Sequence, residues 1–137
     1  MPEAPLPAEL ERFLEKPRQA VVATTTADGA PVSTPTWYEY GDGRLVLSMD
    51  AGGHRLQNLR RDPRLTLTVL GDDWYNQVSM LGRVLEEYPD SDWAVTDRLS
   101  QRYLGEPYGS KDFDCVYVVA EVERWHAFGD PASENDY

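Results

Sequence analysis

The sequence predicts a mainly β, α+β fold: a six-stranded antiparallel barrel with two to three short helices. Three observations lead to this prediction. Short segments rich in β-branched residues recur along the whole chain, turn signals with Gly and Asp separate several of them, and few segments carry an apolar stripe at helical spacing. A chain of 137 residues has the size of one domain, without repeats or internal linkers.

The N-terminal segment predicts an amphipathic helix. Leu10, Phe13 and Leu14 fall on one helical face, and Pro7 stands at the start, where its missing N–H is harmless. Two further helices are predicted. One begins after the glycine turn at residues 52–53, and Asp90 or Ser91 can cap the start of the other. The predicted helices cover residues 7–16, 54–61 and 90–104.

The strands follow from alternation and from turn chemistry. Asp28-Gly29 is a hairpin signal, Gly41-Asp42-Gly43 is a second turn, and residues 64–70 alternate at period two. The predicted strands cover residues 19–26, 31–40, 45–49, 64–70, 75–87 and 113–125. The single domain 1–137 thus divides into an N-terminal helix (7–16), a barrel (18–126) and an acidic polar tail (129–137), which we expect to be frayed.

Charge and hydropathy exclude two classes of partner. The net charge of −11, from 24 acidic and 13 basic residues, opposes a general nucleic-acid surface. No apolar stretch has the length of a membrane span, and no apolar leader precedes the domain, so we expect a cytoplasmic protein without a membrane partner. The basic residues concentrate at positions 55–64, which favours a small anionic ligand, although a solvated helix face explains such an island equally well.

Cysteine and histidine usage gives no support for a metal site. The single Cys115 lies in an apolar strand pattern, cannot form an intrachain disulfide and fits a reducing compartment as an inert packed thiol. His54 and His126 do not have ligand spacing. We therefore expect no metal.

The most informative segment, residues 48–64, has the pattern strand, glycine turn, basic helix start, strand. Gly52-Gly53 frees the backbone to turn, and the unpaired N–H groups at the following helix start, beside Arg55, suit an anion such as phosphate. The plainer alternative is an ordinary glycine connection with solvated basic residues.

Several motifs together resemble one family. They are Ala23-Thr24-Thr25-Thr26-Ala27-Asp28-Gly29-Ala30-Pro31, Thr34-Pro35-Thr36-Trp37-Tyr38, Gly53-His54-Arg55, Gln77-Val78 before Gly82-Arg83-Val84, and Arg98-Leu99 through Arg102-Tyr103-Leu104-Gly105-Glu106-Pro107-Tyr108. Over roughly residues 10–125 the chain resembles the split-barrel flavin-binding proteins related to pyridoxamine 5′-phosphate oxidase, particularly the short type that uses the deazaflavin coenzyme F420.

The resemblance implies an FMN-binding type of split barrel and a site shared between two subunits. The family's phosphate-binding Ser-Arg-Lys triplet falls on residues 53–55, where Arg55 keeps the charge while Gly53 and His54 depart from the pattern. The family's Gln that reaches a cofactor held by the other subunit falls on Gln77, which implies a homodimer with the cofactor site at the interface.

The resemblance implies an F420-dependent reductase that transfers hydride to an unsaturated small molecule. Pyridoxamine-phosphate oxidation is disfavoured, because residues 125–128 lack the family's Arg-rich substrate segment. An FMN-dependent oxidoreductase and a non-catalytic cofactor or tetrapyrrole carrier remain the alternatives. Tyr38 and Tyr75 are the candidate proton donors. The predicted cofactor-binding residues are Thr25, Ser33, Pro35, Trp37, Ser48, Met49, Asp50, His54, Arg55, Asn58, Trp74 and Gln77.

Overall fold

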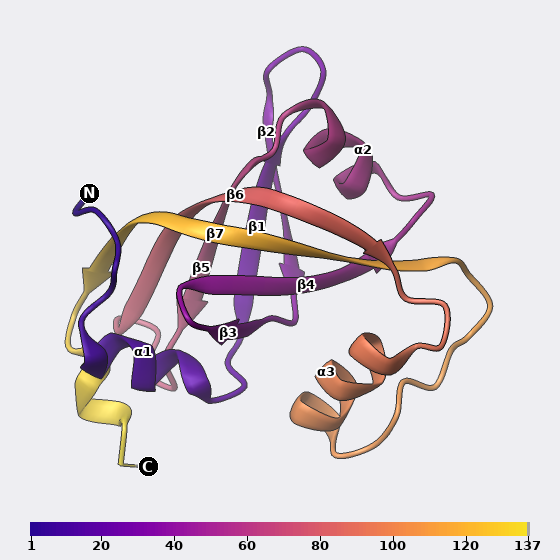
Figure 1. Cartoon of the computed structure of the whole chain (residues 1–137). Helices are drawn as coiled ribbons and strands as arrows, with labels where there is room; N and C mark the ends of the chain where they lie inside the picture. The colour runs from indigo at the N-terminus through magenta and orange to yellow at the C-terminus, as the bar shows by residue number, and fades with distance from the viewer. Residues whose placement is uncertain (137) are drawn as a thin grey trace.

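One antiparallel sheet of seven strands organises the computed structural model, which describes residues 1–136 (Figure 1). The strand order is β2-β1-β5-β6-β7-β4-β3. The strands are β1 (Ala20–Thr25), β2 (Pro31–Thr36), β3 (Glu39–Gly41), β4 (Arg44–Asp50), β5 (Arg64–Leu70), β6 (Gln77–Pro89) and β7 (Cys115–Phe128). The helices are α1 (Ala8–Glu15), α2 (His54–Arg61), α3 (Ala94–Leu104) and the short 3₁₀ helix η1 (Pro131–Glu134).

Alternation along the strands builds the core, because every second side chain of a strand points to the same face. In β5, Leu65, Leu67 and Val69 are buried, and β4 has the same pattern. The apolar stripe of α1, with Phe13 and Leu14 fully buried, packs onto this core. The mainly β antiparallel fold with three helices is therefore confirmed.

The barrel itself differs from the prediction in two respects. The sheet has seven strands rather than six, and within residues 1–136 its end strands, β2 and β3, do not pair with each other, so it is not closed. The extra strand arises because the predicted strand 31–40 divides at Trp37 and Tyr38. There the Tyr38 N–H donates to the Tyr103 hydroxyl at 3.4 Å and the Tyr38 carbonyl accepts from Arg102 at 3.2 Å, which replaces strand pairing by contacts to α3.

The third helix begins later than predicted. Trp93 adopts a left-handed conformation with φ of 63°, and helical geometry starts at the next residue. Asp90 still satisfies the helix start, since its carboxylate accepts the N–H groups of Val95 and Thr96 at 3.1 and 2.8 Å. Gly105, with φ of 76°, ends the helix as predicted.

The tail is ordered by one buried carboxylate, contrary to the expectation that residues 129–137 fray. Glu134 is 1% exposed and accepts from the Asn76 side chain and from the Asp72 N–H, both at 2.6 Å. Arg18 forms an ion pair with it at 3.4 Å. These partners lie far away in sequence, so the polar composition of the tail gave no sign that they would fix η1 in place. Tyr137 lies outside the described residues.

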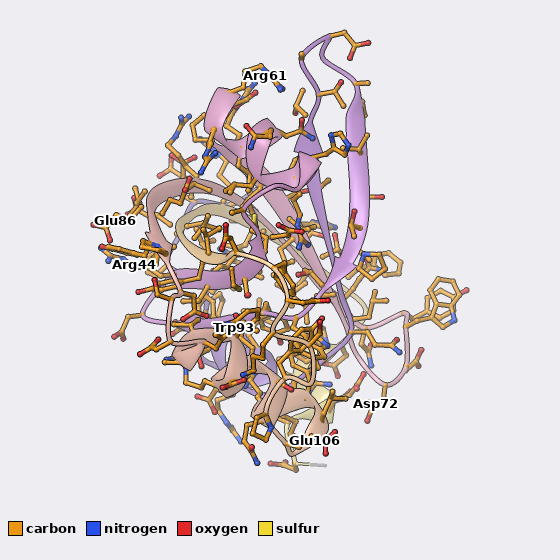
Figure 2. The ribbon with its side chains drawn as sticks, turned by 90° about the vertical axis from the view of Figure 1, so that its right-hand side faces the viewer. Arg44, Arg61, Asp72, Glu86, Trp93 and Glu106 are labelled. Atoms are coloured by element: carbon orange, nitrogen blue, oxygen red, sulfur yellow. The ribbon has the colours of Figure 1, made fainter. Side chains whose placement is uncertain are left out.

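The helices occupy separate places around the sheet. Both termini lie on one side, next to α1, whereas α3 lies opposite them and leads into a long loop (Figure 1). The β1–β2 hairpin projects from the body, with Arg61 of α2 near it (Figure 2), where its guanidinium donates to the Thr25 carbonyl at 3.4 Å. Within residues 1–136 no helix has the length and hydropathy to cross a membrane.

Candidate functional site

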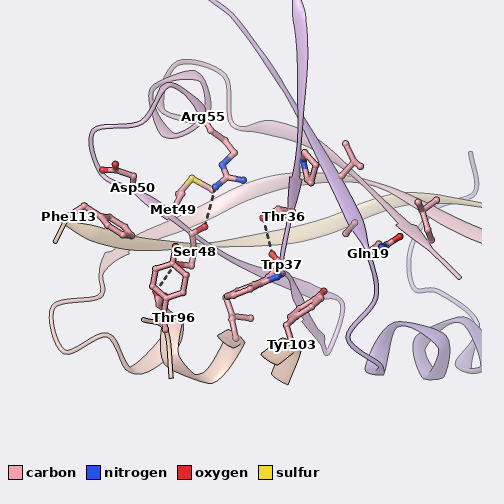
Figure 3. Close-up of a pocket in the computed structure, with 16 residues that line it drawn as sticks. Gln19, Thr36, Trp37, Ser48, Met49, Asp50, Arg55, Thr96, Tyr103 and Phe113 are labelled. Carbon is pink, nitrogen blue, oxygen red and sulfur yellow. Dashed lines mark hydrogen bonds between the residues drawn. The ribbon is translucent and has the colours of Figure 1, made fainter. Parts of the chain in front are cut away.

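A cavity of about 700 Å³ opens between the sheet and α3 (Figure 3). Its wall combines the start of β1, the end of β2, the end of β4, the first turn of α2, the inner face of α3 and the loop that follows α3. The lining residues are Gln19, Ala20, Val21, Pro35, Thr36, Trp37, Ser48, Met49, Asp50, Arg55, Leu70, Thr96, Leu99, Tyr103, Tyr108 and Phe113. Most of this surface is apolar or aromatic, as in typical ligand sites.

Arg55 supplies the positive charge of the cavity. The glycine turn places it in the first turn of α2, and its guanidinium reaches over β4 to donate to the Ser48 carbonyl at 3.4 Å (Figure 3). Burial lowers its pKa from the ordinary value. In residues 1–136 no carboxylate forms an ion pair with Arg55, and α2 has no side-chain N-cap. A half-buried cation beside unpaired helix N–H groups favours an anionic ligand.

An aromatic wall faces this charge. The Trp37 ring stacks on Tyr103 with a centroid distance of 5.4 Å and an interplanar angle of 12°. Tyr108 meets Trp37 edge to face at 5.9 Å. Met49 and Leu99 add apolar surface. The cavity therefore combines a flat apolar surface for a planar ring system with one cation for an anionic group.

A set of hydroxyl groups forms part of the same wall. The Ser48 and Thr96 hydroxyls lie 2.6 Å apart, bridging β4 and α3. The Cys115 thiol contacts both of them, at 3.2 and 2.9 Å, and the residue itself is buried. This placement agrees with the interpretation of Cys115 as a packed thiol.

The structure brings half of the predicted cofactor-binding residues together. Six line the cavity: Pro35, Trp37, Ser48, Met49, Asp50 and Arg55. The shared turn between β4 and α2 explains four of them, because one strand end and one helix start converge there. Trp37 and Pro35 reach the cavity from the end of β2.

The other six lie outside the cavity wall: Thr25, Ser33, His54, Asn58, Trp74 and Gln77. His54 is exposed at the helix start. Asn58 is buried and donates to the Thr24 hydroxyl at 3.2 Å, so it ties α2 to β1. Trp74 is 65% exposed. Its contribution and that of Gln77 to a partner's cavity stay predictions.

Neither candidate proton donor lines the cavity of its own chain. Tyr38 is fully buried, and its hydroxyl lies 2.9 Å from the carbonyls of Leu14 and Lys16. Burial raises its pKa well above the ordinary value. Tyr75 is exposed and stacks on Trp74 outside the cavity. Tyr38 therefore lacks the geometry that a proton donor requires, whereas the role of Tyr75 stays a prediction.

Sequence reasoning missed the α3 side of the cavity. Thr96, Leu99 and Tyr103 come from α3, while Tyr108 and Phe113 come from the loop after it. The available signal was the unusual density of aromatic residues around the end of this helix, in the motif that carried the family resemblance. The apolar face of a helix does not by itself distinguish a core contact from a cavity wall.

Comparison with known proteins shows which family model and which solved structures this chain is similar to. A family model described as pyridoxamine 5′-phosphate oxidase matches residues 6–129. No curated protein sequence matches. A solved structure named F420 reductase is similar with a TM-score of 0.82 and 23% identity, covering 88% of this chain and 98% of that one.

Two further solved structures have similar folds. The conserved hypothetical protein Rv2991 from Mycobacterium tuberculosis has a TM-score of 0.73 and 27% identity, covering 96% of this chain and 89% of its own. HupZ from Group A Streptococcus has a TM-score of 0.65 and 17% identity, covering 90% and 94%.

Proposed function

Because the chain belongs to the pyridoxamine 5′-phosphate oxidase family, we propose that it is an oxidoreductase that uses reduced F420 to reduce an unsaturated, conjugated small molecule. The observation that carries this proposal is Arg55: a half-buried cation without a carboxylate partner in residues 1–136, at one end of a cavity with an aromatic wall. A phosphorylated deazaflavin has the two chemical parts that such a cavity suits.

The departures at residues 53 and 54 support F420 over FMN. The family's triplet supplies two cations to the FMN phosphate, whereas here Gly53 has no side chain and His54 is exposed outside the cavity wall. Among the described residues that line the cavity, Arg55 is the one cation and Asp50 the one carboxylate. The fold similarity to a structure named F420 reductase, over nearly all of that chain, points the same way.

Reduced F420, when bound, supplies a hydride, and the protein supplies position and a water-poor environment. Arg55 and the α2 N–H groups hold the phosphate. The stacked pair Trp37 and Tyr103 would orient the ring, and the apolar side chains of Leu99 and Met49 would keep water away from it. Tyr38 has no role in this proposal, because its hydroxyl is buried against the Leu14 and Lys16 carbonyls away from the cavity.

The site is proposed to be completed by a second copy of the chain. Trp74, Tyr75 and Phe128 form a stacked aromatic group on the surface, with exposed fractions of 65, 56 and 52%. Exposed aromatic groups of this kind favour a protein interface. In the proposed homodimer, Trp74 and Gln77 reach the cavity of the partner.

Anaerobic mixing of the protein with reduced F420 and a panel of conjugated enones, enoates and quinones tests the function. The proposal predicts that the absorbance of oxidised F420 returns with at least one acceptor, and that Arg55→Ala slows this under subsaturating cofactor. Tight binding without hydride transfer to any acceptor would favour a carrier. Turnover with FMN but not with F420 would indicate an FMN-dependent oxidoreductase instead.

A further inference from the structure

A buried carboxylate accepts a hydrogen bond from a hydroxyl group on the cavity wall. Asp90, at the start of α3, is 3% exposed, and one of its oxygens accepts from the Thr96 hydroxyl at 2.7 Å. The same oxygen accepts the Thr96 N–H at 2.8 Å, and the other accepts the Val95 N–H at 3.1 Å. Next in line, the Ser48 hydroxyl lies 2.6 Å from Thr96 Oγ1 (Figure 3).

The direction of these hydrogen bonds follows from counting protons. A carboxylate only accepts, so the one hydroxyl proton of Thr96 points to Asp90. Thr96 Oγ1 is then an acceptor on its other side, and the Ser48 hydroxyl donates its own proton to it. The Cys115 sulfur lies near both hydroxyl oxygens, and its thiol also reaches the Val116 carbonyl at 3.8 Å. Sulfur is a weak acceptor and does not compete with Thr96 Oγ1 for the Ser48 proton.

These hydrogen bonds leave the Ser48 hydroxyl with only its lone pairs available to a ligand. Ser48 is half-buried on the cavity wall, and its proton is committed to Thr96. A hydroxyl group that ordinarily serves as donor or acceptor becomes a fixed acceptor here, and it rejects a ligand that presents a carbonyl or ether oxygen at this point.

We propose that Ser48 is a specificity-determining residue that accepts a hydrogen bond from a ring N–H of the bound ligand, with Thr96 and Asp90 as its positioning residues. The ligand class is a planar heterocycle with an N–H between carbonyl groups, the cyclic imide edge that flavins and deazaflavins share. This inference rests on the proposed function, because it assumes that such a ring enters this cavity.

A purely structural role is the competing explanation. The Ser48–Thr96 contact also joins β4 to α3, so its loss affects the cavity shape for every ligand. A structural role predicts equal weakening of all ligands. A specificity role predicts that only ligands with the N–H are weakened, because only they lose a partner.

The test measures selectivity rather than affinity alone. FMN and 5-deaza-FMN, each with and without a methyl group on the imide nitrogen, are titrated by fluorescence into wild-type protein, Ser48→Ala and Ser79→Ala. Ser79 is the matched control, since its hydroxyl pairs with Thr68 at 2.9 Å on β5 and β6, outside the cavity wall. Thermal melting checks the fold of each variant.

We expect wild type and Ser79→Ala to prefer the N–H compounds about tenfold or more, and Ser48→Ala to bind both members of a pair within about threefold. An unchanged preference in Ser48→Ala would overturn the assignment while leaving the proposed function intact. No binding of either parent compound to wild type up to millimolar concentration would overturn the assignment of Ser48, while the proposed function is decided separately by titration of F420 itself.

Variants of Thr96 independently test the direction of the hydrogen bonds from Ser48 through Thr96 to Asp90. Thr96→Val keeps the shape but removes the acceptor for the Ser48 proton, so Ser48 becomes free to donate and the preference for N–H compounds falls. Thr96→Ser restores the hydroxyl and with it the preference. Equal preferences in the two variants would overturn the role of Thr96 and Asp90 as positioning residues.

Discussion

At the scale of single residues, Tyr38 shows how a residue in a functional motif serves the fold. Its ring is fully buried, its hydroxyl lies between the carbonyls of Leu14 and Lys16, and the Arg102 guanidinium lies 5.3 Å from its ring centroid. The hydroxyl joins the end of α1 to the segment between β2 and β3.

Tyr38→Phe is predicted to lower the free energy of unfolding by about 1 kcal/mol and to leave cofactor affinity unchanged, because it removes one buried hydrogen bond that points away from the cavity. Urea denaturation and a cofactor titration measure the two effects. Loss of cofactor affinity at unchanged stability would instead indicate that Tyr38 contributes to the cofactor site.

The same scale explains which site residues the sequence could predict. Arg55 and Asp50 were predictable, because a glycine turn between a strand and a helix start has a local signature. Thr96 and Tyr103 were not, since their place in the cavity depends on how α3 packs on β4. Asn58 has the residue type of a ligand contact, but its side chain binds Thr24 on β1, which is distant in sequence.

At the scale of elements, η1 depends on the buried pair Arg18 and Glu134. Both side chains are almost fully buried, with exposed fractions of 4 and 2%. The guanidinium also donates to the Phe13 carbonyl at 2.7 Å and lies 3.9 Å from the centroid of its ring. One carboxylate thus connects the C-terminal helix, the start of β1 and the β5–β6 turn.

Glu134→Ala is predicted to cost about 3 to 5 kcal/mol of unfolding free energy, because it leaves the Arg18 charge buried without a partner. The matched control is Asp136→Ala, which removes the exposed pair with Arg12 at 3.5 Å and is expected to change stability by less than about 0.5 kcal/mol. Urea midpoints measure both, and a similar small effect of the two variants would contradict the importance of the buried pair.

The same carboxylate predicts a pH dependence. Burial alone would raise the pKa of Glu134, but hydrogen bonds from Asn76 and the Asp72 N–H, with the charge of Arg18, hold it below the ordinary value. A lowered folded-state pKa stabilises the fold above the unfolded pKa of about 4.3 and loses this effect as pH falls below it. The stability difference between wild type and Glu134→Gln should therefore shrink below about pH 4, and a constant difference would contradict this account.

The limits of sequence prediction differ between elements. The bounds of α2 and β5 match the predicted ranges, because a glycine turn and strict alternation define them locally. The predicted strand 31–40 divided because Tyr38 bonds to α1 and α3, and η1 formed because Glu134 finds distant partners. Non-local contacts of this kind override local preference.

At the scale of the whole molecule, the open sheet leaves the cavity and the aromatic group of Trp74, Tyr75 and Phe128 accessible. We predict a dimer at micromolar concentration that Trp74→Ala and Phe128→Ala weaken about tenfold or more, since aromatic side chains contribute strongly to interfaces. Sedimentation velocity measures the association, with Tyr88→Ala, at another exposed aromatic position, as the control. A monomeric wild type would contradict the shared site.

The central claim is that Arg55 holds the phosphate of a deazaflavin in the cavity. Fluorescence titration of F420 and FMN into wild type, Arg55→Ala and Arg60→Ala tests it most directly. Arg60 is the matched control, because it belongs to the same helix but pairs with Glu87 on the surface at 2.7 Å. The account predicts tighter binding of F420 than of FMN, about a hundredfold loss in Arg55→Ala and little change in Arg60→Ala. F420 binding that persists in Arg55→Ala, or no F420 binding by wild type, would contradict the claim.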